Sequence, residues 1–143
     1  MNRDHTDRLL GAVDAVLNRY LVEGADGQPR PLRYNPVDYQ TLKRLETQPD
    51  SRATDIAGQL GVPATTMQSA LDRLVRMGFL QKGNHPTDGR AKVYRLSEKG
   101  VALRHKIHRQ DRANIKAMLN VLDVNEQDRF VEMMERIEAA VRR

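Results

Sequence analysis

Residues 64–77 combine hydrogen-bonding side chains with arginines at the spacing of a single amphipathic helix. The apolar residues of this run are Met67, Leu71, Leu74 and Val75, which lie on one helical face. The polar residues of the opposite face are Thr65, Thr66, Gln68, Ser69, Asp72, Arg73 and Arg76. Short hydroxyl and amide groups near the N-terminal end, with arginines further along, suit contacts to DNA bases and phosphates. We therefore expect this helix to enter a DNA major groove by its N-terminal end.

Individual roles on this helix can be stated as hypotheses. Gln68 has the groups needed for a bidentate pair with adenine, and Arg73, about one turn further, would reach a base or the backbone. Thr65, Thr66 and Ser69 would meet base edges or phosphates. The alternative for the two threonines is that they only cap and solvate the helix.

A shorter helix and a tight turn precede the helix of residues 64–77. Ile56, Ala57 and Leu60 share a face at helical spacing, and Thr54 is expected to cap this first helix. Gly61 suits a left-handed C-cap, and Pro63 suits a helix start. The pattern predicts a helix-turn-helix.

A basic hairpin follows the second helix, which ends at Gly78. One strand begins at Phe79, residues 83–90 are rich in turn formers, and residues 91–96 alternate as a returning strand. Arg90 at the tip is the candidate for insertion into a narrow minor groove, with Asp88 orienting its guanidinium. Lys82 and Lys92 flank the hairpin and are expected to meet phosphates. A hairpin in this position is the wing of a winged helix.

The motifs of this region resemble the MarR (multiple antibiotic resistance regulator) family. Asp88-Gly-Arg90 and Leu96-Ser-Glu-Lys-Gly100 are similar to the family's wing signature, with Ser97 in place of threonine. Further matches are Leu60-Gly-Val, Leu71-Asp-Arg-Leu74, Met77-Gly-Phe-Leu80, and Leu32 with Asn35-Pro36. Many members carry an arginine where this chain has Ser69, which shifts the expected base readout toward Gln68 or Arg73. The resemblance also implies a homodimer and a small amphipathic effector ligand, bound between the winged lobe and the dimer helices.

Charge is unevenly distributed along the 143 residues, which are enough for one domain. Lysines and arginines number 24 against 19 acids, and residues 73–109 hold ten cations against Asp88 and Glu98. Such a basic block is the electrostatic footprint of a polyanionic partner, although a merely soluble charged surface is the alternative. The chain has no cysteine, a leader-like apolar segment is absent from its N-terminus, and no membrane-length apolar run occurs. We expect a cytoplasmic, prokaryotic protein with no membrane partner.

Helices on either side of the winged lobe carry wide apolar faces. They are predicted over residues 4–22, over 97 to about 122 with Ser97 as the cap, and after Asn125, which is expected to cap the last helix. Another helix, capped by Asn35, opens the lobe. Pairing across a two-fold axis would bury these faces, whereas the alternative is an intramolecular three-helix subdomain.

The sequence contains no constellation typical of an enzyme, so we expect no catalytic residues and no cofactor. Glycine-rich phosphate loops, Ser/His/Asp sets and close carboxylate pairs are all missing from its motifs. His105 and His108 stand three residues apart on a helix and could face one ion, and some zinc-sensing relatives of the resembled family use histidines of this helix. Because Arg104, Lys106 and Arg109 crowd the pair with positive charge, we expect two solvated histidines and no metal.

Together these patterns predict a mainly α protein with a small β-hairpin wing. Residues 1–143 form one domain, in which 35–96 are the winged helix-turn-helix lobe and 4–22 with 97–143 are a helical dimerisation region. The predicted function is a sequence-specific, DNA-binding transcriptional regulator: a homodimeric repressor on a pseudo-palindromic operator, released by a small ligand. The alternative is a winged-helix module that binds protein or RNA without a specific operator.

Overall fold

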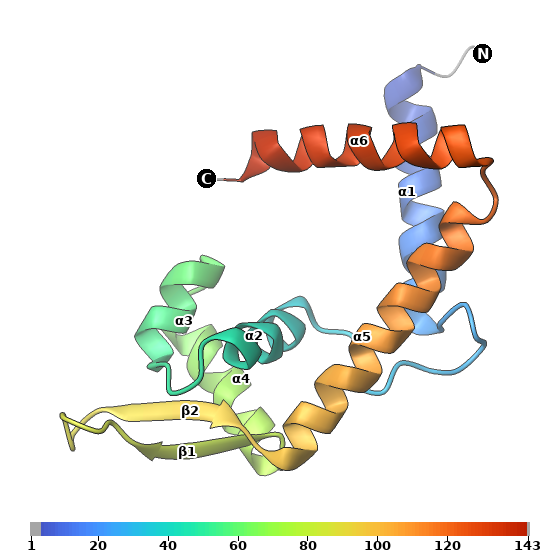
Figure 1. Ribbon diagram of the computed structural model, residues 1–143. Coiled ribbons are helices and arrows are strands. Elements are labelled where there is room, and N and C mark those ends of the chain that lie inside the picture. Colours follow the sequence, from blue (N-terminus) through green and yellow to red (C-terminus); the bar gives the residue numbers. More distant parts are fainter. Residues whose placement is uncertain (1–3, 143) are drawn as a thin grey trace.

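The computed structural model describes residues 4–142 and is mainly helical, with one two-stranded antiparallel sheet (Figure 1). In chain order the elements are α1 (His5–Val22), α2 (Pro36–Thr47), α3 (Ala53–Leu60), α4 (Ala64–Arg76), β1 (Leu80–Asn84), β2 (Lys92–Leu96), α5 (Glu98–Leu119) and α6 (Val124–Val141). The predicted fold class, a helical protein with a hairpin wing, is confirmed. Within the described residues, no helix has both the length and the apolar character needed to cross a membrane.

The core lies in the lobe formed by α2, α3, α4 and the hairpin. Its fully buried side chains include Leu42 of α2, Ile56 of α3, and Met67, Leu71 and Leu74 of α4. Those of α3 and α4 are apolar positions that the helical spacing predicted, so burial of one stripe per helix assembles the helix-turn-helix. Gly61 adopts the expected left-handed conformation, with φ 67°, and ends α3.

The hairpin is joined to the lobe by a third segment of chain. Its register runs from Leu80 opposite Leu96 to Asn84 opposite Lys92. The N–H of Tyr94 also donates to the carbonyl of Ser51 at 3.0 Å, which forms an isolated bridge on the other side of β2. The ring of Tyr94 is buried in the core, so a side chain as well as a backbone hydrogen bond attaches the wing to the lobe.

Two of the four predicted N-caps are confirmed. The Asn35 carboxamide accepts from the N–H of Val37 at 3.0 Å and from that of Asp38 at 3.2 Å. Ser97 Oγ accepts from the N–H of Gly100 at 3.0 Å. These contacts satisfy first-turn donors that have no partner within their own helix.

The other two cap predictions were wrong. Helix α3 begins before Thr54, because the carbonyl of Arg52 already accepts from the N–H of Ile56 at 3.1 Å. Helix α6 begins at Val124, so Asn125 lies inside it, and the N-cap is Asp123. The N–H of Glu126 donates to Asp123 Oδ1 at 2.9 Å, and the N–H of Asp123 donates to Glu126 Oε1 at 3.0 Å. This reciprocal pair of hydrogen bonds is a capping box. Helix α5 also ends at Leu119, before the predicted Leu122.

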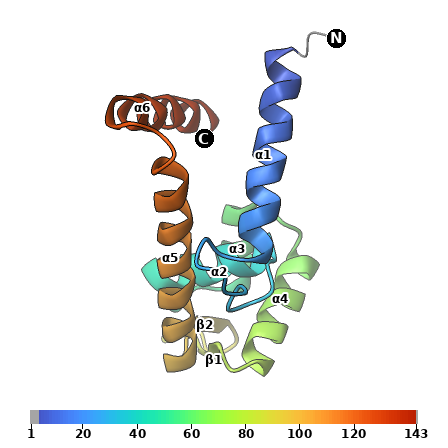
Figure 2. The same cartoon turned by 90° about the vertical axis from the view of Figure 1, so that its right-hand side faces the viewer.

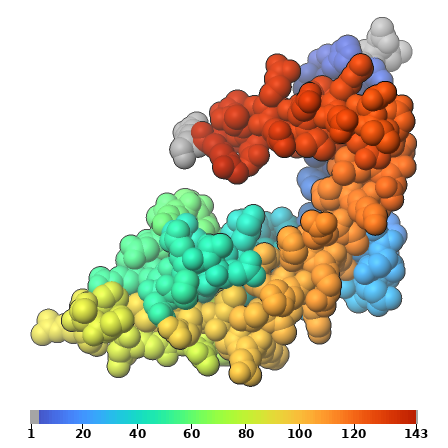
Figure 3. Space-filling model, in the orientation of Figure 1, coloured from blue at the N-terminus to red at the C-terminus, as the bar shows by residue number. Residues whose placement is uncertain are grey.

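Helices α1 and α6 project away from the lobe and contain no buried residue. Helix α5 leaves the wing and leads to α6, which runs across the end of the molecule, and α1 rises beside α5 (Figures 1 and 2). The space-filling view shows a deep hollow between α6 and the lobe (Figure 3). The exposed large apolar side chains of the two helices are Leu9, Leu10, Val13, Val16, Leu17, Val22, Val124, Val131, Met133, Met134, Ile137 and Val141.

The loop between α1 and α2 is fastened to α5 by polar contacts. The N–H of Ala25 donates to Asn114 Oδ1 at 2.7 Å, and Arg30 Nη1 lies 2.8 Å from Asp111 Oδ1. Arg30 also lies over the Tyr39 ring, 5.0 Å from its centroid, and burial raises the pKa of the Tyr39 hydroxyl. The loop thereby ties α1, α2 and α5 together.

Candidate nucleic-acid interface

The N-terminal end of α4 exposes the polar side chains that the sequence placed on its outer face. Thr65, Thr66, Gln68 and Ser69 are exposed, as is Arg76 near the other end, whereas Met67 and Ala70 between them are buried. The helix therefore presents hydroxyl and amide groups to solvent and its apolar stripe to the lobe. It can place three or four hydrogen-bonding side chains in a groove without rearranging the core.

Arg73 forms an ion pair within the lobe, with Asp38. The side chain of Asp38 is only 7% exposed, whereas that of Arg73 is 40% exposed. A buried carboxylate needs a partner, so this pair fixes α4 against α2 and leaves part of the guanidinium accessible. Spacing along the chain could not predict this pair, because the two residues are 35 positions apart.

Gln68 links the outer face of α4 to the wing. Its Nε2 donates to Asp72 Oδ1 at 2.9 Å and to the hydroxyl of Tyr94 at 3.2 Å. Lys82 of β1 lies on the same tyrosine, with Nζ 6.0 Å from the ring centroid. Helix α4 and the wing therefore form one connected surface.

The wing tip is shaped by side chains that bind its own backbone. His85 Nδ1 accepts from the N–H groups of Thr87 and Asp88, at 3.3 and 3.2 Å. Asp88 Oδ1 accepts from the N–H of Arg90 at 3.1 Å, and Asp88 Oδ2 lies 3.8 Å from Arg52 Nη2. The prediction that Asp88 orients the Arg90 guanidinium was wrong: the carboxylate holds the backbone of Arg90 and faces Arg52.

The predicted cations of the wing all lie at its surface. Lys82, Arg90 and Lys92 are exposed, and Lys92 Nζ donates to Asn84 Oδ1 at 2.6 Å across the hairpin. Arg95 pairs with Asp50, with Nε 2.8 Å from Oδ1, and this hydrogen bond lowers the pKa of the Asp50 carboxyl. Asp50 has a positive φ of 57°. Its ion pair with Arg95 ties the turn before α3 to β2.

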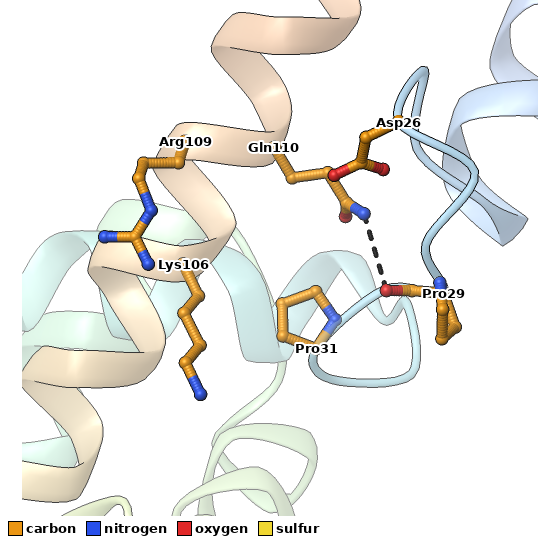
Figure 4. Close-up of a pocket in the computed structure, with 6 residues that line it drawn as sticks. All are labelled: Asp26, Pro29, Pro31, Lys106, Arg109 and Gln110. Atoms are coloured by element: carbon orange, nitrogen blue, oxygen red, sulfur yellow. Dashed lines mark hydrogen bonds between the residues drawn. The ribbon is translucent and has the colours of Figure 1, made fainter.

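A cleft of about 450 Å³ lies between the α1–α2 loop and α5 (Figure 4). Its lining residues are Asp26, Pro29, Pro31, Lys106, Arg109 and Gln110. Gln110 is 6% exposed, and its Nε2 donates to the carbonyls of Gln28 and Pro29 at 3.2 and 3.4 Å. Its buried Oε1 has no hydrogen-bond partner within residues 4–142. The cleft thus combines two cationic side chains, one acidic side chain, two proline rings and a buried amide.

His105 and His108 are exposed on α5. In the part of the chain that the structure describes, no three histidine or acidic residues gather as a metal-binding group. The two histidines thus lack a third such neighbour there.

The sequence of this chain is similar to those of known transcriptional regulators. The model of the MarR family matches residues 34–92, which run from the start of α2 to the beginning of β2. The HTH-type transcriptional regulator MhqR of Bacillus subtilis (strain 168) is 26% identical over 103 residues, covering 72% of this chain and 71% of that protein.

Solved structures share the fold over nearly the whole chain. The transcriptional repressor CouR, bound to a 23-mer DNA duplex, has a TM-score of 0.71 at 22% identity, covering 94% of this chain and 92% of that one. The PcaV transcriptional regulator of Streptomyces coelicolor, in complex with its natural ligand, has a TM-score of 0.62 at 23% identity, covering 96% and 91%. At these identities the likeness establishes the fold alone.

Proposed function

We propose, because the chain belongs to the MarR family of transcriptional regulators, that it represses transcription by binding a pseudo-palindromic DNA operator as a homodimer. The observation that carries this proposal is the continuous surface of α4 and the wing. Exposed hydroxyl and amide groups on α4 are joined through Gln68 and Tyr94 to a hairpin that presents Lys82, Arg90 and Lys92. A major-groove helix beside a cationic wing can engage bases and backbone at the same time. Such a repressor would work in the cytoplasm, where the DNA lies.

Dimerisation is proposed from the apolar faces of α1 and α6. Ile137 is 56% exposed and Leu17 is 49% exposed, and both belong to stripes that run the length of their helices. Stripes of this length are too costly to leave in water, and a two-fold axis would cover both copies at once. The dimer would carry two α4 helices, which fit successive major grooves when they lie about 34–36 Å apart.

Within the operator, each group has a distinct role. Thr65, Thr66 and Ser69 would contact base edges or phosphates near the start of α4. Lys82 and Lys92 would contact phosphates, which strengthens binding to every sequence equally. Arg76 lies further along the exposed face of α4 and would reach the backbone.

Arg90 at the wing tip is proposed to enter the minor groove. Replacing it by alanine should weaken operator binding by about 1–3 kcal/mol, because the guanidinium is lost from a groove of concentrated negative potential. Titration of a fluorescent operator duplex at two salt concentrations would measure this effect. Lys92→Ala is the matched control: it should weaken specific and scrambled duplexes alike and flatten the salt dependence. Equal losses on both duplexes for Arg90→Ala would argue against insertion.

The cleft on α5 is proposed to hold the effector, a small amphipathic anion. Lys106 and Arg109 would hold its charge, and Pro29 and Pro31 would contact its apolar body. Because the cleft joins α5 to the loop that fastens α1 and α2, occupancy there would change the spacing of the two α4 helices.

The effector proposal can be tested with small aromatic and aliphatic carboxylates in a thermal-shift series. We expect some of them to raise the Tm of the wild-type protein, and the rise to be lost in the Lys106→Gln, Arg109→Gln double variant. Neutral amides of the same shape are the matched ligands. A Tm rise that persists in the double variant would place the ligand elsewhere.

A further inference from the structure

We infer that Gln68 reads its base through the amide oxygen alone, and so selects a base that offers an amino group in the major groove. The bases that do so are adenine and cytosine. This inference rests on the proposed function, because it names the rule by which one residue of α4 distinguishes operators. It differs from the bidentate adenine contact predicted from the sequence, which requires Nε2 as well.

The neighbours of Gln68 fix which way its amide faces. The carboxylate of Asp72 accepts hydrogen bonds and has none to donate, so the amide atom 2.9 Å from Asp72 Oδ1 is the nitrogen. The same Nε2 donates to the Tyr94 hydroxyl at 3.2 Å. An amide nitrogen has two hydrogens, and both are used by these partners. Neither bond uses the oxygen, which is therefore the group left to meet DNA.

Both partners are held in place by the fold. Asp72 lies four residues along α4, so its carboxylate is directly above Gln68 on the same helical face. Tyr94 is 2% exposed, and its backbone N–H is bonded to Ser51. Turning the amide over would place its oxygen against the Asp72 carboxylate and leave two acceptors facing each other. The wing thereby sets the hydrogen-bonding character of a residue on the recognition helix.

An outward oxygen accepts but cannot donate. Adenine offers its N6 amino group and cytosine its N4 amino group in the major groove, whereas guanine and thymine offer acceptors there. If Gln68 contacts its base through the amide oxygen alone, it should bind adenine and cytosine about equally well, and guanine and thymine less well. A bidentate glutamine would instead favour adenine, because it also donates to N7.

The test begins with an operator recovered by selection from random duplexes. Gln68→Ala identifies the base position that depends on this residue. Duplexes with each of the four bases there should show adenine and cytosine within about threefold of each other, and guanine and thymine roughly fivefold or more weaker. Replacing the adenine at this position by 7-deazaadenine, which lacks N7, should change the affinity less than twofold. Replacing it by deoxynebularine, which lacks the amino group, should weaken binding roughly fivefold.

The Tyr94→Phe, Asp72→Ala double variant supplies the internal comparison. It removes both acceptors and keeps the aromatic ring, so Nε2 becomes free and 7-deazaadenine should now weaken binding. The duplex series with wild-type protein is decisive even if the double variant fails to fold. The inference would be overturned if 7-deazaadenine weakened the binding of the wild-type protein as much as deoxynebularine does. It would also be overturned if the Gln68→Ala variant kept the base preferences of the wild type. Failure to recover any operator would instead overturn the proposed function.

Discussion

Replacing Ile137 with aspartate is expected to convert a dimer into a monomer and to lower operator affinity roughly a hundredfold or more. Ile137 lies on the apolar face of α6, and each dimer would bury two copies of the new carboxylate. A monomer has one α4 helix and one wing, so the second half-site no longer binds intramolecularly. Sedimentation equilibrium and operator titration of the same preparation would measure both effects.

Ala139→Asp is the matched control for this substitution. Ala139 is two residues along the same helix and is exposed, on the face where acidic side chains such as Glu135 already lie. The control adds the same charge to the same helix and should leave the oligomeric state and the affinity unchanged. A dimeric Ile137→Asp protein with wild-type operator affinity would remove α6 from the proposed interface.

The second large effect concerns stability, at Gly100 in the first turn of α5. A Cβ on this residue would lie 2.1 Å from the Phe79 carbonyl oxygen and 3.1 Å from its carbon. That oxygen cannot move freely, because it accepts the N–H of Ser97 at 3.0 Å. Gly100→Ala should therefore lower the free energy of unfolding by about 3 kcal/mol, as overpacking against backbone does. Urea denaturation, compared by midpoint at constant slope, would measure the loss.

Gly58→Ala provides the opposite expectation within the same lobe. Gly58 is in α3, and a Cβ there would meet nothing within 4 Å. Alanine at this site should stabilise the protein by about 1 kcal/mol, since glycine is the weaker helix former. A Gly100→Ala protein as stable as the wild type, or more stable, would contradict the close approach of Phe79 to α5.

Patterns within a single element allowed much of the fold to be predicted. The helical stripe of Met67, Leu71 and Leu74 fixed the buried face of α4, and Gly61 marked the turn before it. Gly100 was visible only as the end of a motif, and its physical role became clear from the distance to Phe79. Local spacing determines such faces and turns because the helix repeat is constant.

Contacts between distant parts of the chain could not be predicted in this way. The pairing of Arg73 with Asp38, and of Gln68 with Tyr94, depends on how α2, α4 and β2 pack. The Asp123 cap was missed although its partner Glu126 stands three residues later, which is the spacing of a capping box. The orientation of the Gln68 amide, and hence its expected base preference, follows only from the folded structure.

The surface of α4 and the wing is proposed to recognise one DNA sequence. Selection from a random duplex library at two salt concentrations tests this recognition most directly. We predict that both selections recover the same inverted repeat, with half-sites about ten base pairs apart. Salt-sensitive binding with no shared sequence would contradict the claim and favour a winged-helix module that binds protein or RNA through its basic face.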